Sequence, residues 1–139
     1  MTNRSMPPGA IIPELAYPDV RAAADWLCQA FGFSERLQIG NHRAQLVFGG
    51  GSIIVTKRNS SDSPLVDTSH AVMVCVDDVD AHYEQAKRYG AKITNPPKDY
   101  EFGERQYSVE DPGGHHWVFS QSIADVDPQT WGGILNKSN

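Results

Sequence analysis

The chain has 139 residues, of which 40% are hydrophobic and 21% charged, a balance typical of a single folded domain rather than a disordered chain. The formal net charge is −5, and the absence of a block of basic residues argues against a nucleic-acid partner. No apolar run approaches the roughly 20 residues that cross a bilayer, and residues 1–9 lack the apolar stretch of a signal peptide. We therefore expect no membrane association and a cytoplasmic location, with Cys28 and Cys75 as free thiols of a reducing compartment.

The first half of the chain predicts a strand, a helix and three further strands. Residues 11–17 form a short apolar run bounded by prolines, which indicates a strand. Asp19 is a suitable N-cap, apolar residues then recur at three- and four-residue spacing over 20–31, and Gly32 is suited to end the helix. The three strands that follow, separated by glycine turns, are expected at 34–39, 42–48 and 52–57.

The same order repeats in the second half. The β-branched run 69–76 predicts a strand, after which Asp77 or Asp78 caps a helix that Gly90 ends. Asp77 precedes Gly90 by the same number of residues that separates Asp19 from Gly32, and such internal repetition indicates a duplicated unit. The last three strands are expected at 91–94, 105–110 and 115–121.

These elements predict an α+β fold made of two βαβββ modules within one domain. Neither module buries much surface alone, so we expect the two to form a curved mixed sheet with helices on one face and a concave cavity on the other. The expected divisions are module 1 at about 10–58, a polar linker at 59–68, module 2 at about 69–121, and a C-terminal tail at 122–139.

Three segments give this pattern a family resemblance. The run 100–119, which contains a DPGG turn, resembles the closing hairpin of the glyoxalase/bleomycin-resistance/extradiol-dioxygenase (vicinal oxygen chelate) superfamily. Residues 76–81 with 90–91 resemble the start of that family's second module, and residues 25–33 resemble its first helix. Together the segments span about 11–121.

The resemblance implies several activities and a cofactor. Family members commonly hold a divalent metal such as Zn, Ni, Fe or Mn through His, Glu or Gln, and serve as lyases, isomerases, extradiol dioxygenases or thiol transferases acting on fosfomycin. A metal-free branch binds drugs such as bleomycin in a groove shared by two chains. Family members often dimerise, so the resemblance also implies a homodimer.

The family's metal-ligand positions carry the wrong residue types here. They fall on Ile12, Ala71 and Val118, and the fourth, around 54–56, offers no carboxylate. Because a divalent metal needs three or four N, O or S ligands, we expect no metal and no other cofactor. The alternative is a displaced metal site built from Glu14, His70 and His116, with His70 brought in by a β-bulge.

Period-two alternation separates core positions from cavity positions. Tyr107, Val109, Trp117 and Phe119 share one parity and should pack beneath the helices, as should Ile11 of the first strand. The opposite parity and the loop before the seventh strand supply the predicted ligand-binding residues, which are Ile12, Gln45, Met73, Cys75, Phe102, Gln106, Ser108, His116 and Val118.

Glu14 is the catalytic candidate. It lies in an apolar strand, where burial would favour its neutral form and suit it to act as a general base. It is equally suited to pair with Arg43 across the sheet.

Three functions fit these residues. The first is metal-independent binding of a small organic molecule in the concave cavity. The alternative is a metal-dependent lyase, isomerase or dioxygenase of the same superfamily with a displaced metal site. A third is a metal-free enzyme that uses Glu14 as its base. The sequence leaves open whether any reaction is catalysed.

Overall fold

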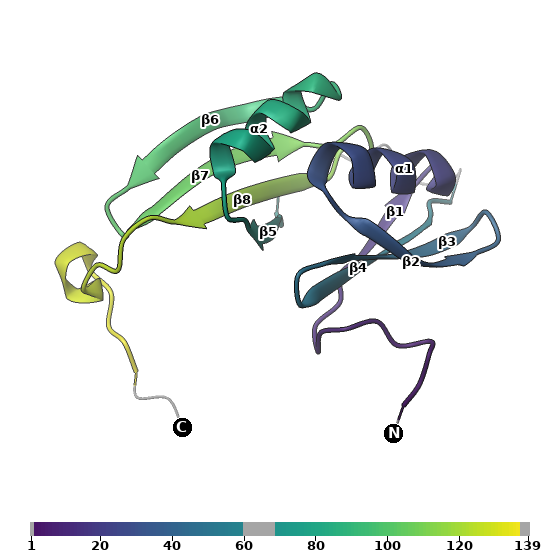
Figure 1. Cartoon of the computed structure of the whole chain (residues 1–139), viewed down its shortest axis with the longest axis horizontal. Coiled ribbons are helices and arrows are strands. Elements are labelled where there is room, and N and C mark those ends of the chain that lie inside the picture. The colour runs from purple at the N-terminus through teal and green to yellow at the C-terminus, as the bar shows by residue number, and fades with distance from the viewer. Residues whose placement is uncertain (1, 60–68, 137–139) are drawn as a thin grey trace.

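The computed structural model describes residues 2–59 and 69–136, so most of the expected linker and the end of the tail lie outside the described residues. Two βαβββ units follow one another along the chain (Figure 1). The elements are β1 (Glu14–Tyr17), α1 (Val20–Phe31), β2 (Ser34–Ile39), β3 (Arg43–Phe48), β4 (Gly51–Lys57), β5 (Val72–Cys75), α2 (Val79–Arg88), β6 (Lys92–Tyr100), β7 (Glu104–Glu110), β8 (His116–Ser122) and the 3-10 turn η1 (Pro128–Trp131).

Both helices begin at the predicted type of cap. The side chain of Asp19 accepts a hydrogen bond from the Ala22 backbone N–H at 3.1 Å, and Asp78 accepts one from Ala81 at the same distance. Gly32 takes the left-handed conformation, with φ of 84°, and ends α1 as expected. In the described part of the chain neither helix is long and apolar enough to cross a membrane.

The strands form two four-stranded mixed sheets, which confirms the α+β fold of two βαβββ modules. Sheet A has the order β1-β4-β3-β2 and sheet B the order β5-β8-β7-β6. In each sheet the first strand of the module lies parallel to the last one, and the other pairs are antiparallel. Among the described strands no hydrogen-bonded pair joins the two sheets, so the chain by itself carries two sheets rather than one continuous curved sheet.

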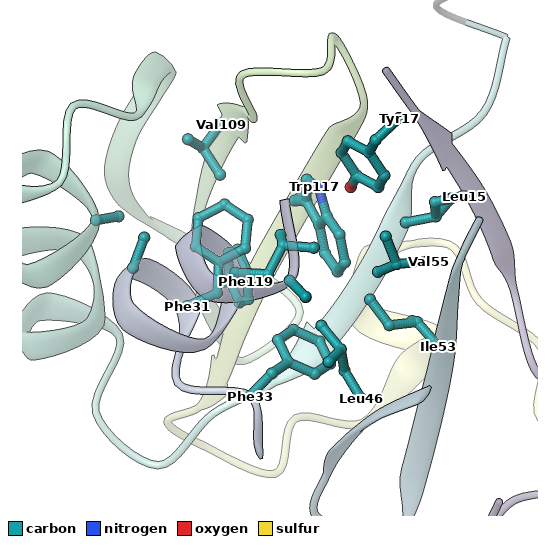
Figure 2. Packing of buried hydrophobic residues seen from close by; sticks show 14 of the residues in the cluster. Leu15, Tyr17, Phe31, Phe33, Leu46, Ile53, Val55, Val109, Trp117 and Phe119 are labelled. Carbon is teal, nitrogen blue, oxygen red and sulfur yellow. The ribbon is translucent and has the colours of Figure 1, made fainter. Parts of the chain in front are cut away.

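The two modules share one hydrophobic core on the helix-bearing sides of their sheets (Figure 2). Phe31, at the end of α1, packs edge-on against Trp117 and Phe119 of β8, with ring centroids 5.3 and 4.8 Å apart. All three side chains are fully buried, and burying a side chain of this size stabilises a fold by about 1.5–3 kcal/mol. The core parity predicted for β7 and β8 is confirmed, since Tyr107 and Val109 are also fully buried.

A polar cluster fastens module 1 to the turn between β7 and β8. The buried carboxylate of Asp111 accepts hydrogen bonds from the hydroxyl of Tyr17 at 2.5 Å and from Trp117 Nε1 at 3.0 Å. The backbone N–H groups of Gly113 and His115 donate to its other oxygen, both at 3.0 Å. Burial and the neighbouring Asp111 carboxylate raise the pKa of Tyr17, so its hydroxyl stays protonated and donates.

One predicted core position is wrong. Ile11 is 87% exposed, because β1 begins at Glu14 and the preceding residues do not follow its alternation. Pro13 has no N–H to add to the sheet, and its carbonyl accepts the first bond from Ile54 N at 2.9 Å. From there the expected alternation holds, with Leu15 and Tyr17 buried.

Candidate functional site

The face of sheet B that points away from the helices gathers most of the predicted ligand-binding residues. Strand register places Met73 beside Val118, which in turn lies beside Ser108. Two residues further along β5, on the same face, Cys75 lies beside Ser120, and Ser120 lies beside Gln106. Met73 is 53% exposed and Cys75 is also exposed, so this face is open to solvent in the single chain.

A cavity of about 400 Å³ lies where the edge of this face meets module 1. β5 supplies one wall, including Met73 and Cys75, and the glycine turn 49–51 supplies part of the other. The remaining lining residues are almost all apolar; they are Ile11, Pro13, Phe33, Phe48, Ser52, Ile53, Val72 and Val74. We call this space the β5 cavity.

A second cavity, of about 530 Å³, shares Met73 and Cys75 with the β5 cavity and is more polar. Phe102, a predicted site residue, lines it and stacks on Tyr100 with ring centroids 5.3 Å apart. Glu104 lines it as well. Its Oε1 atom accepts hydrogen bonds from Ser120 Oγ at 2.5 Å and from Gln106 Nε2 at 2.9 Å.

Three other predicted residues line a third cavity, of about 400 Å³, at the far end of the same face. They are Ser108, His116 and Val118, and they lie there with His70 and Ala71. The predicted residues of sheet B therefore share one face but divide between different cavities.

The corresponding face of sheet A is arranged differently from the prediction. Gln45 lies on this face beside Ile54, which separates it from Glu14 in the register. It is only 3% exposed because residues near the N-terminus cover it. Ile12 is partly exposed and precedes β1, while its neighbours Ile11 and Pro13 line the β5 cavity.

Comparison with known proteins places the chain in a family. The model of the Glyoxalase/Bleomycin resistance protein/Dioxygenase superfamily matches residues 11–119. The chain belongs to this superfamily.

The chain is also similar to individual proteins at moderate to low identity. The crystal structure of TioX from Micromonospora sp. ML1 is 35% identical, with a TM-score of 0.68, and the match covers 86% of this chain and all of that one. FosX, a genomically encoded fosfomycin resistance protein from Listeria monocytogenes, is 16% identical with a TM-score of 0.68, and the match covers 85% of this chain and 96% of that one. At this identity the likeness is one of fold alone. The uncharacterized protein Rv0887c of Mycobacterium tuberculosis is 25% identical over 131 residues, covering 85% of this chain and 77% of its own.

The residues that the structure describes do not fit the metal that many superfamily members hold. Glu14 is exposed and pairs with Arg43, its Oε1 atom lying 3.0 Å from Arg43 Nη2. His116 Nε2 lies 3.8 Å from a carboxylate oxygen of Glu110. Within residues 2–59 and 69–136, no three His, Cys, Asp or Glu side chains come together in a way that could hold a metal ion.

Sequence reasoning missed Glu104, although the signal was present. The residue lies two positions before Gln106 on the same strand, so the alternation that selected Gln106 and Ser108 selects it as well. The predicted strand began one residue too late to include it.

Proposed function

We propose that this protein binds a small organic molecule in the β5 cavity, without a metal. The observation that carries the proposal is the lining of that cavity, in which Phe33, Phe48 and Met73 offer an apolar surface. A volume of about 400 Å³ lies within the roughly 300–1,000 Å³ typical of small-molecule sites. Metal chemistry is not part of the proposal, because the family's ligand positions carry Ile12, Ala71 and Val118, whose side chains have no ligand atom.

Polar groups that could orient the ligand lie in the adjoining second cavity. Glu104 faces it as a carboxylate that accepts bonds from Ser120 and Gln106. A few polar groups beside an apolar surface are the usual construction of a specific small-molecule site. A ligand that extends from the β5 cavity past Met73 and Cys75 would reach this carboxylate.

The proposal includes a homodimer. In the single chain, β1 and β5 each lie at one edge of their sheets, and edge strands present backbone groups that another chain can cover. Met73 and Cys75 on β5 are exposed at the same place. A second copy that covers this region would enclose the β5 cavity.

The test uses the apolar fluorescent probe 8-anilinonaphthalene-1-sulfonate (ANS). We expect the native chain to bind ANS at one saturable site, and we expect Met73→Asp to weaken that binding at least tenfold, because it places a negative charge in the cavity wall beside the anionic probe. Ile39→Asp is the matched control, since Ile39 is an exposed apolar residue at the end of β2, outside the residues that line the β5 cavity. Equal ANS binding by both variants would remove the β5 cavity as the site.

A further inference from the structure

Residues 3–9, which we call the N-terminal arm, lie across the face of sheet A that points away from α1 (Figure 1). One side chain from each of three strands donates a hydrogen bond to a backbone carbonyl of the arm. Arg36 Nη2 of β2 donates to Arg4 O at 3.0 Å, Gln45 Nε2 of β3 donates to Ser5 O at 2.8 Å, and Ser52 Oγ of β4 donates to Pro8 O at 2.7 Å.

The arm covers this face closely. Gln45 and Ser52 are only 3% and 6% exposed, although neither points into the shared core. Ile54, which lies beside Gln45 on the same face, is 9% exposed. Within the arm, Pro7 is buried. The arm makes a turn at residues 3–6, where the Met6 N–H donates to Asn3 O at 3.1 Å. This side of sheet A is therefore a surface fitted to a short turn-forming stretch of chain.

One of the three donors is also oriented by a neighbouring side chain. Arg36 Nη1 donates to Gln45 Oε1, which fixes the side-chain amide so that its N–H group points toward the arm. Preorganised donors lose little entropy on binding, which favours affinity. All three contacts reach main-chain carbonyls, and every peptide carries such groups whatever its side chains.

From this arrangement we propose that the face of sheet A beneath the arm is a binding site for a peptide-like chain, and that the N-terminal arm occupies it as an internal competitor. The recognised chemistry is a row of amide carbonyls with a proline ring at the buried position. The site is separate from the β5 cavity, so the inference does not depend on the proposed function. The two adjoin at Ser52, which holds the arm and also lines the cavity.

An arm attached to its own site competes at a high local concentration, on the order of 1 mM for a short tether. For a free peptide with an intrinsic dissociation constant of about 100 μM, this competition weakens the apparent affinity by roughly tenfold. A substitution that displaces the arm should remove the competition and raise the apparent affinity for the free peptide by the same roughly tenfold.

The experiment uses the full chain and a fluorescein-labelled peptide of residues 2–10 as the probe, with binding read by fluorescence anisotropy. Pro7→Asp places a charge at the buried ring and should release the arm. Pro8→Asp adds the same charge at an exposed neighbour and is the control. We expect Pro7→Asp to bind the peptide at least tenfold more tightly than either the native chain or Pro8→Asp.

Two further variants test the donors. Adding Ser52→Ala to Pro7→Asp should weaken peptide binding at least threefold, and adding Gln45→Leu as well should abolish it. Thermal unfolding checks that each variant is folded. If the variant that carries Gln45→Leu is unfolded, the comparison of Pro7→Asp with and without Ser52→Ala decides whether the donors bind the peptide. Failure of Pro7→Asp to bind more tightly than the control, or binding that is indifferent to Ser52→Ala, would overturn the proposal.

A second peptide tests the ligand class. It keeps the proline at the buried position and replaces the other side chains of residues 2–10 with alanine. Binding of this peptide to Pro7→Asp within about threefold of the native sequence is expected, because the contacts are to backbone carbonyls. Loss of binding would restrict the site to the chain's own arm and refute recognition of peptide-like ligands in general.

Discussion

Replacing Asp111 by alanine should destabilise the protein more than any single surface substitution. The Asp111 side chain lies in the turn after β7, is 3% exposed, and accepts bonds from two buried side-chain donors, Tyr17 Oη and Trp117 Nε1. In Asp111→Ala both donors lose their acceptor where water has little access. An unsatisfied buried donor costs about 1–3 kcal/mol, so after allowance for the relieved burial of the carboxylate we expect the free energy of unfolding to fall by about 3–5 kcal/mol.

Urea unfolding followed by tryptophan fluorescence measures this loss, and Tyr17→Phe supplies the comparison. That variant removes one donor and leaves the Asp111 carboxylate with three, so it should cost only about 1 kcal/mol. If Asp111→Ala fell within 1 kcal/mol of the native chain, or if Tyr17→Phe cost as much as Asp111→Ala, the carboxylate would not be the fastening point between module 1 and the β7–β8 turn.

Three further predictions concern packing, pH and assembly. Gly113→Ala should destabilise the chain by about 1–3 kcal/mol, because the new Cβ would lie 2.4 Å from the ring of Tyr17. Gly50→Ala is the control: its Cβ meets nothing within 4 Å, so this variant should unfold near the native urea midpoint. Burial lowers the pKa of His82 below 6.5, so the folded state binds fewer protons than the unfolded state. The free energy of unfolding should therefore fall as the pH drops below about 6.5. The accompanying fall in the urea midpoint should be smaller in His82→Gln. Light scattering after size-exclusion chromatography should give about twice the chain mass of 15.3 kDa, and Met73→Lys should shift the protein toward the monomer, while a native mass of one chain would contradict the dimer.

Local chemistry was enough to predict the modules. Asp19 and Gly32 cap α1 as expected because a side-chain oxygen and a left-handed glycine satisfy helix ends without help from tertiary structure. Alternation placed Met73 and Cys75 on the open face of sheet B because one face of each strand must cover the core. Alternation failed at Ile11, where the strand had not yet begun.

The cover over sheet A could not be predicted from the sequence. The N-terminal arm is polar and rich in proline and glycine, which is typical of a tail, and its contacts with Gln45 and Ser52 are made through backbone carbonyls. Such contacts leave no signature in the side-chain pattern of the arm. The division of one expected sheet into two had the same origin, since the relative placement of the modules depends on long-range packing around Phe31.

Protection of Cys75 tests the proposed binding site most directly. Cys75 is exposed and lines both the β5 cavity and its neighbour. In a Cys28→Ala variant it is the one remaining thiol of the chain, so the reaction with 5,5′-dithiobis(2-nitrobenzoic acid) reports on Cys75 alone. We predict that saturating ANS slows this reaction at least fivefold. An unchanged rate, with ANS fluorescence showing that the probe is bound, would place the binding site elsewhere on the protein.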